Sequence, residues 1–187
     1  MTARERLALK LREDSLKRWE HASPAYRRLA KTKETQIVRP EREILHVDDD
    51  PLMTQIVAKR LQPYGYQVAS LNDPTEAINE VIHKNRRVVL LDIDMPGLNG
   101  LEVLKEIKRY DGGVQVIMLT GLVTVSSVLE SVRLGAEAIF FKPLEDFEEL
   151  HQALDRTFQK IDHWWDALHD LSHRKRVERG AETVEQC

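Results

Sequence analysis

Cysteine is almost absent from this 187-residue sequence, since the single cysteine is Cys187, the last residue. One cysteine can form neither an internal disulfide nor a cysteine-based zinc site, so we expect the chain to act in a reducing cytoplasm. Long apolar runs are also missing: no stretch approaches the roughly 18 residues of a membrane-spanning helix. Residues 1–6 are not followed by the apolar core of a signal peptide, so we expect no secretory signal and no membrane insertion.

Neither sign of charge dominates, because the net charge is only −3, but the charged residues are unevenly distributed along the chain. Residues 1–43 carry 12 basic and 7 acidic side chains, whereas residues 145–187 carry 6 basic and 11 acidic ones. The acids within the basic segment weaken any case for nucleic-acid binding. We expect a basic helical extension and linker over 1–42, a core domain over 43–144, and a last helix with a polar tail over 145–187.

Short apolar, β-branched runs alternate with helical patterns through the middle of the chain. Such runs are typical of strands covered on both faces, which favours a parallel sheet. Asp50-Pro51 and Asp73-Pro74 are typical of helix starts. The predicted strands are 44–47, 67–69, 88–91, 114–119 and 138–141. The pattern predicts an α/β fold, a doubly wound five-stranded parallel sheet, with its functional site at the carboxyl ends of the strands.

The last helical pattern runs far past the predicted sheet. Apolar residues recur every three or four positions over 144–171, and neither proline nor glycine interrupts the pattern before residue 180. A helix continuing to about residue 173 would be roughly 40 Å long. Phe158, Trp164 and Trp165 on this stretch need cover, which we expect from an N-terminal helix around 7–19 or from a second subunit. The sequence thus predicts helical extensions at both ends, with a homodimer through terminal helices as one outcome.

Acidic side chains follow two of the predicted strands. Asp48, Asp49 and Asp50 follow the first strand, and Asp92 and Asp94 follow the third. We assign Asp50 to helix capping, but capping does not explain the others. Because neighbouring strands lie about 5 Å apart, Asp48, Asp49 and Asp92 should converge. Two carboxylates about 4 Å apart repel by about 4 kcal/mol at an effective dielectric near 20, so a divalent cation, Mg²⁺, is predicted between them.

Two further polar residues follow predicted strands, Thr120 after the fourth and Lys142 after the fifth. A hydroxyl and an ammonium beside a metal-bound carboxylate form a clamp for a phosphoryl group, whose oxygens the lysine and the metal neutralise. A free carboxylate can attack phosphorus and form an aspartyl phosphate. The set therefore predicts phosphoryl-transfer chemistry at this edge of the sheet.

Four segments resemble the receiver domain of bacterial two-component response regulators, a CheY-like domain. They are 44–51 (ILHVDDDP), 90–100 (LLDIDMPGLNG), 118–121 (MLTG) and 140–143 (FFKP). The resemblance covers about residues 42–156 and implies a flavodoxin-like sheet with strand order 2-1-3-4-5. It also implies a histidine kinase or phosphotransfer protein as phosphoryl donor, a downstream protein target, and no enzymatic activity beyond slow self-dephosphorylation.

The resemblance also implies a role for each residue of the predicted site. Asp92 would accept the phosphoryl group, Thr120 would turn toward its oxygens, and Lys142 would bridge Asp92 and the phosphate. The implied Mg²⁺ ligands are Asp49, Asp92 and the backbone carbonyl of Asp94, with Asp48 holding a metal-bound water. The Lys142–Pro143 peptide bond would be cis, and the small Gly121 would leave the phosphoryl group open to water.

One position departs from the family pattern. Three residues before the lysine, receivers usually carry tyrosine or phenylalanine, and this chain has Ile139. We therefore do not expect the usual relay from Thr120 through that aromatic. Phe140 is no simple substitute, because it lies on the opposite face of the strand.

Two alternatives remain open. Residues 91–94 also resemble the nucleophile motif of haloacid-dehalogenase-like phosphatases, with Asp92 as nucleophile and Asp94 as general acid. That family, however, places its further metal-binding acids after the lysine, whereas here Asp48 and Asp49 precede it. The second alternative is a pseudo-receiver that serves only as a scaffold. The 43 residues after Leu144 are too short for a DNA-reading module, so we expect no DNA binding.

Overall fold

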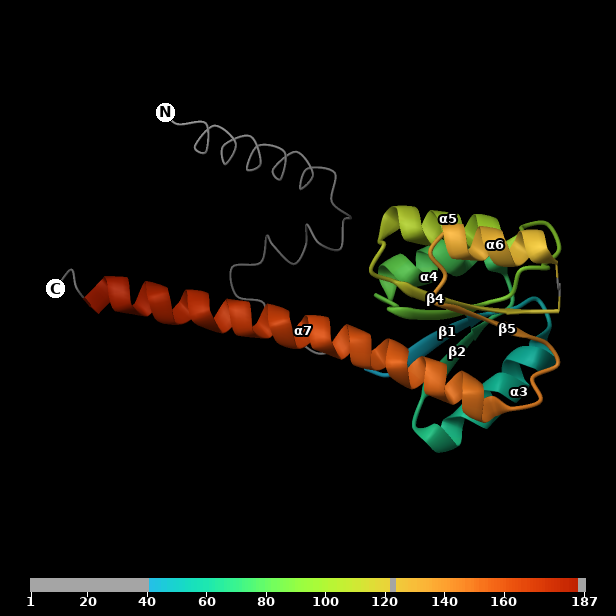
Figure 1. Cartoon of the computed structure of the whole chain (residues 1–187), viewed down its shortest axis with the longest axis horizontal. Helices are drawn as coiled ribbons and strands as arrows, with labels where there is room; N and C mark the ends of the chain where they lie inside the picture. Colours follow the sequence, from blue (N-terminus) through green and yellow to red (C-terminus); the bar gives the residue numbers. More distant parts are fainter. Residues whose placement is uncertain (1–40, 122–123, 185–187) are drawn as a thin grey trace, which may run out of the picture. The chain divides into compact units, whose positions relative to one another are not determined.

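The computed structural model describes residues 41–121 and 124–184 (Figure 1). Side chains are described as far as residue 171. The expected N-terminal helix around 7–19, and nearly all of the linker after it, lie outside the described residues. Within the described part, no helix is both long enough and apolar enough to cross a membrane.

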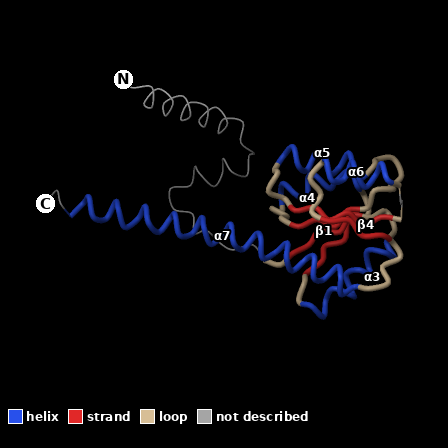
Figure 2. The backbone as a smooth tube through the Cα atoms, viewed as in Figure 1, coloured by secondary structure: helices blue, strands red, loops and turns tan. Residues whose placement is uncertain are grey.

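A five-stranded parallel sheet forms the centre of the fold, with strand order β2-β1-β3-β4-β5 (Figure 2). The strands are β1 (Glu43–Val47), β2 (Gln67–Leu71), β3 (Val88–Leu91), β4 (Gln115–Thr120) and β5 (Ala138–Phe141). Every residue of β3 and β4 is buried, because these strands lie inside the sheet and are covered on both faces. The doubly wound sheet and the order 2-1-3-4-5 expected from the sequence are confirmed.

Helices cover both faces of the sheet (Figures 1 and 2). They are α3 (Pro51–Leu61), α4 (Ala77–His83), α5 (Gly100–Tyr110), α6 (Val125–Arg133) and α7 (Phe147–Val184), with 3-10 turns η1 (Gln62–Tyr64) and η2 (Pro74–Glu76). Apolar side chains of α3 and α7 form one core with the sheet, and those of α4 and α5 form a second core on the opposite face. The two layers hold the strands parallel and bring their carboxyl ends to one edge.

Two of the helical segments begin where the sequence predicts. The side chain of Asp50 accepts a hydrogen bond from the amide of Leu52 at 2.8 Å, at the start of α3. The side chain of Asp73 accepts one from the amide of Thr75 at 2.9 Å, at the start of η2. Each satisfies a backbone donor that the helical turn leaves free.

The predicted C-terminal helical extension is confirmed by α7, which is 38 residues long. Its first turns are buried against the sheet through Leu150, Leu154 and Ile161, among others. Beyond Ile161 the exposed fractions of the apolar residues rise, to 64% for Trp164 and 56% for Leu171. The helix continues for 23 residues past Ile161, which is about 35 Å at 1.5 Å per residue.

Candidate functional site

The acidic residues of the site lie at the carboxyl edge of β1 and β3. Val47 pairs with Leu91, and the next amide along the chain, that of Asp92, donates to the carbonyl of Val47 at 3.0 Å. Carboxylate oxygens of Asp48, Asp49 and Asp92 consequently lie within 4.8 Å of one another. Mg²⁺ prefers oxygen ligands and is usually held by one or two carboxylates with waters, so this donor set fits the ion.

Asp92 is nearly buried, and both of its carboxylate oxygens are held. Oδ1 accepts hydrogen bonds from the backbone amides of Ile93 at 2.7 Å and Asp94 at 3.4 Å. Oδ2 accepts one from Nζ of Lys142 at 2.8 Å. Backbone amides cannot rotate away, so they give this carboxylate a defined orientation.

Asp48 lies deeper than Asp92 and shares the lysine with it. Its Oδ2 lies 2.6 Å from Nζ of Lys142, and its Oδ1 accepts a hydrogen bond from the amide of Asp50 at 3.0 Å. Burial raises the pKa of Asp48, but the contacts with His46, Lys142 and Asp50 lower it more, and the net pKa lies below the usual value of 3.8. Asp48 is therefore ionised at neutral pH.

Lys142 is the cation of the site. Burial lowers its pKa, but the hydrogen bonds and charges of Asp48 and Asp92 outweigh this effect and raise the pKa above the usual value of 10.5. The lysine is consequently an ammonium at neutral pH, held between two carboxylates. The Lys142–Pro143 peptide bond is cis, as the resemblance implied.

The structure places Thr120 at the last residue of β4, fully buried and paired with Phe141 in β5. Its carbonyl accepts a hydrogen bond from the amide of Lys142 at 2.8 Å, which joins the ends of the two strands. Gly121 follows, and the space where its side chain would lie is open. The side chain of Asp94, by contrast, is exposed and does not belong to the carboxylate cluster.

Ile139 and Phe140 point to opposite faces of β5, as predicted. Ile139 packs against the core on the α4 and α5 side, and Phe140 packs against the core on the α3 and α7 side. Phe140 therefore does not fill the place of the aromatic residue that receivers usually carry at position 139.

Sequence reasoning missed two residues that shape the site. A Cβ atom on Gly100, the first residue of α5, would lie 1.8 Å from the carbonyl oxygen of Asp92, so only glycine fits there. His46 is completely buried under Asp48, with Nε2 3.6 Å from Oδ2 of that residue. A histidine inside an otherwise apolar strand was the signal for the second, whereas nothing in the sequence marked the close approach of Gly100.

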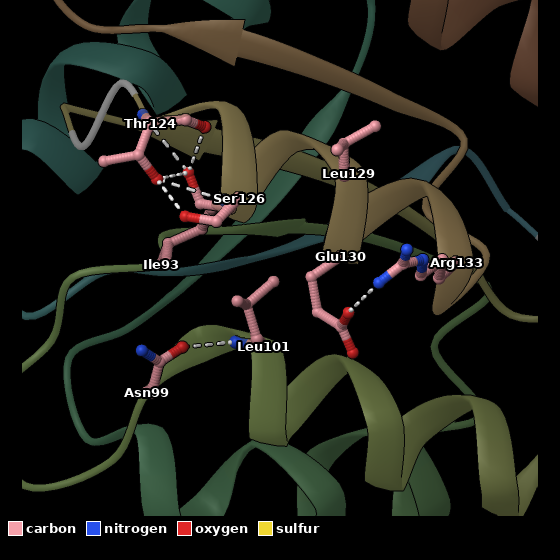
Figure 3. Close-up of a pocket in the computed structure, with 9 residues that line it drawn as sticks. Ile93, Asn99, Leu101, Thr124, Ser126, Leu129, Glu130 and Arg133 are labelled. Carbon is pink, nitrogen blue, oxygen red and sulfur yellow. Dashed lines mark hydrogen bonds and ion pairs between the residues drawn. The ribbon is translucent and has the colours of Figure 1, made fainter.

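A groove of about 500 Å³ lies between the start of α5 and helix α6 (Figure 3). Ile93, Leu101 and Leu129 line it, and Glu130 and Arg133 form an ion pair of 3.6 Å at its side. None of the predicted metal-binding or phosphoryl-binding residues lines this groove. The acidic cluster at the edge of the sheet, and not the groove, is therefore the candidate site.

Comparison with known proteins identifies the family of the domain that carries this site. A sequence model of the response regulator receiver domain matches residues 44–155. The transcriptional regulatory protein ZraR of Klebsiella oxytoca is 37% identical over 115 residues, which make up 62% of this chain and 26% of ZraR. The DNA-binding response regulator MtrA of Mycolicibacterium smegmatis is 33% identical over 56% of this chain and 46% of its own. The chain thus spans about a quarter of ZraR and less than half of MtrA.

Solved receiver structures have the same fold. A CheY-like receiver domain protein from Methanospirillum hungatei matches 65% of this chain and 96% of its own, with a TM-score of 0.61 and 25% identity. The response regulator TrrA of Thermotoga maritima, in complex with Mg²⁺-BeF, matches 63% of this chain and 99% of its own, with a TM-score of 0.57 and 32% identity. These matches point to a signalling domain and not to a dedicated enzyme, which removes the phosphatase alternative. The chain belongs to the response regulator receiver domain family.

Proposed function

We propose that the chain accepts a phosphoryl group on Asp92 from a histidine kinase or phosphotransfer protein, with Mg²⁺, and works as a phosphorylation-controlled switch for protein contacts. The observation that carries this proposal is the position of Lys142, whose Nζ lies 2.6 Å from Asp48 and 2.8 Å from Asp92. An ammonium at this point lies where the charge of an incoming phosphoryl group needs compensation.

In the proposed transfer, a carboxylate oxygen of Asp92 attacks the phosphorus of a phosphohistidine. The new O–P bond forms as the N–P bond breaks, and the donor imidazole keeps the electron pair and takes up a proton. The amides of Ile93 and Asp94 orient the attacking carboxylate, while Lys142 and the hydroxyl of Thr120 receive the phosphoryl oxygens. Asp49, Asp92 and the backbone carbonyl of Asp94 would hold Mg²⁺, with Asp48 on a metal-bound water, and the ion would neutralise charge on the transferred group.

Intact-mass spectrometry after incubation with acetyl phosphate and Mg²⁺ tests this proposal. The wild-type chain is expected to gain about 80 Da, the mass of one phosphoryl group. Asp92→Asn should gain nothing, whereas Asp73→Asn, which alters a capping aspartate at η2, should be phosphorylated like the wild type. The same gain in Asp92→Asn would contradict the assignment.

A scaffold that works without phosphorylation is the second candidate. The absence of an aromatic at the position of Ile139 favours it, because the usual path from Thr120 to the surface is then missing. A measurement of partner binding before and after treatment with beryllofluoride separates the two candidates. We expect the affinity to change; an unchanged affinity would favour the scaffold.

We also propose that a second copy of the chain covers the exposed end of α7. Ile161, Trp164, Leu168 and Leu171 follow the 3-4-3 spacing of a coiled-coil seam. Leu150, Leu154 and Ile161 belong to the same seam and are buried against the sheet, whereas Trp164, Leu168 and Leu171 farther along it are exposed.

The charges next to this seam also suit pairing with an identical helix. Asp162, Asp166 and Asp170 occupy the outward positions of the same repeat. Ala167, which flanks the seam, is uncharged, so two copies would meet without repulsion at this point. Helix pairing of this kind would also supply the tertiary packing that an isolated helical stretch needs for stability.

Light scattering tests the dimer. Leu168→Asp places a charge in the seam and is expected to give a monomer, whereas Asp170→Ala on the outward face should leave a dimer. A monomeric mass for the wild type, with and without beryllofluoride, would contradict the proposal.

The partners that we propose are proteins. ZraR is named a transcriptional regulatory protein and MtrA a DNA-binding response regulator. The matches cover only part of ZraR and of MtrA, so we do not propose transcriptional regulation or DNA binding for this chain. The segment after the sheet is a single helix in the described residues, which supports signalling through protein contacts. We place this signalling in the cytoplasm, where phosphoryl donors of this kind are made.

A further inference from the structure

His46 is a buried polar residue next to the carboxyl end of β1, between Leu45 and Val47. Its side chain is 0% exposed, and its two ring nitrogens have no hydrogen-bond partner among the residues that the structure describes. Buried polar atoms are nearly always hydrogen-bonded, so this histidine calls for an explanation. Its Nε2 lies 3.6 Å from Oδ2 of Asp48, just beyond hydrogen-bond distance.

The Asp48 oxygen that lies 3.6 Å from His46 is also the one that Lys142 holds. Lys142 donates to Oδ2 of Asp48 at 2.6 Å and to Asp92 at 2.8 Å. An ammonium has three protons, and a phosphoryl group on Asp92 would compete for them. As the lysine turns toward that group, Oδ2 of the buried Asp48 loses part of a charge-assisted hydrogen bond, which is costly for a buried carboxylate.

We propose that His46 is a positioning residue: it donates a hydrogen bond from Nε2 to Oδ2 of Asp48 and replaces Lys142 at this oxygen when the lysine turns toward the phosphoryl group. This inference rests on the proposed phosphorylation of Asp92. A shift of less than about 1 Å brings Nε2 within hydrogen-bond distance, and bonds of this kind tighten when the reacting group is bound.

The tautomer of His46 tests the proposal directly in the wild-type chain. A neutral imidazole carries one proton, so donation from Nε2 leaves Nδ1 as the bare nitrogen. Nitrogen NMR of histidine-labelled protein should show the Nε2–H tautomer, and its Nε2 signal should shift when Mg²⁺ and beryllofluoride are added. A proton on Nδ1 in both states would overturn the proposal.

Three variants test the same contact through Mg²⁺ affinity, measured by calorimetry in the presence of beryllofluoride, which stands in for the phosphoryl group on Asp92. His46→Leu removes the donor, and loss of such an outer partner typically weakens metal binding by about tenfold or more. His46→Gln places an amide nitrogen at the position of Nε2 and should restore affinity to within about threefold of the wild type. His46→Asn places its amide at the position of Nδ1 and should behave like His46→Leu.

The outcomes separate this inference from the proposed function. If the wild type gains no phosphoryl group from acetyl phosphate, the proposed function fails whatever His46 does. If the wild type is phosphorylated but His46→Leu and His46→Gln bind Mg²⁺ equally well, the inference about His46 fails alone. Should His46→Leu not fold, the tautomer in the wild-type chain decides the question.

Discussion

Replacement of Gly100 by alanine should destabilise the fold and disturb the phosphoacceptor together. The added Cβ would lie 1.8 Å from the carbonyl oxygen of Asp92, where ordinary contact begins near 3.4 Å. The start of α5 and the segment that carries Asp92 must therefore separate by about 1.6 Å. Both sides of the clash are backbone, so no side chain can rotate to relieve it.

The magnitude follows from three effects. Overpacking in a well-filled site costs about 1–3 kcal/mol, and the rigid backbone places this clash near the upper end. The separation also strains the 2.9 Å hydrogen bond from the amide of Gly100 to the carbonyl of Ile93, worth about 1 kcal/mol. The better helix propensity of alanine returns up to about 1 kcal/mol. We expect a net loss of about 2–3 kcal/mol in the free energy of unfolding.

Urea unfolding followed by circular dichroism measures this loss, with an expected fall in the midpoint of about 1 M or more. Gly112→Ala is the matched control, because its nearest neighbour would be the carbonyl oxygen of Lys108 at 4.0 Å. The control should stay within about 0.5 kcal/mol of the wild type. Equal midpoints for Gly100→Ala and the wild type would refute the reasoning.

Three further predictions concern the charges of the site. Lys142→Met leaves two buried carboxylates without their cation, so the free energy of unfolding should fall by about 3 kcal/mol in urea unfolding, and phosphorylation by acetyl phosphate should be lost. Folding lowers the pKa of Asp48, so the ionised carboxylate stabilises the fold above pH 3.8, and this stabilisation is lost as the pH falls below that value. In an acid titration, the free energy of unfolding of Asp48→Asn should therefore fall less steeply below pH 3.8 than that of the wild type. Mg²⁺ at ten times its dissociation constant should raise the free energy of unfolding by about 1.4 kcal/mol, and Asp49→Ala should remove most of this increase in thermal unfolding. No Mg²⁺ effect on the wild type would contradict the metal site.

The sheet and the cluster at its edge could be predicted because both depend on local sequence. Strands buried on both faces show as continuous apolar runs, as in 88–91, and parallel strands bring their ends together. The approach of Asp48, Asp49 and Asp92 follows from these two facts alone.

What the sequence did not reveal depends on contacts between distant segments. Val125, Leu129 and Val132 recur at helical spacing and lie in α6, yet all three are exposed, with Val125 at 78%. Periodicity identifies a helix but not the surface that covers its apolar side. The close approach of Gly100 and the place of His46 likewise depend on how α5 and β1 pack around the site.

Reduction of the phosphorylated chain with borohydride tests the central claim most directly, since an acyl phosphate on aspartate is reduced to homoserine while free carboxylates are not. After treatment with acetyl phosphate and Mg²⁺, peptide mass spectrometry should find homoserine in place of Asp92 and leave Asp48, Asp49 and Asp94 unchanged. Reduction at another aspartate, or at none, would contradict the account.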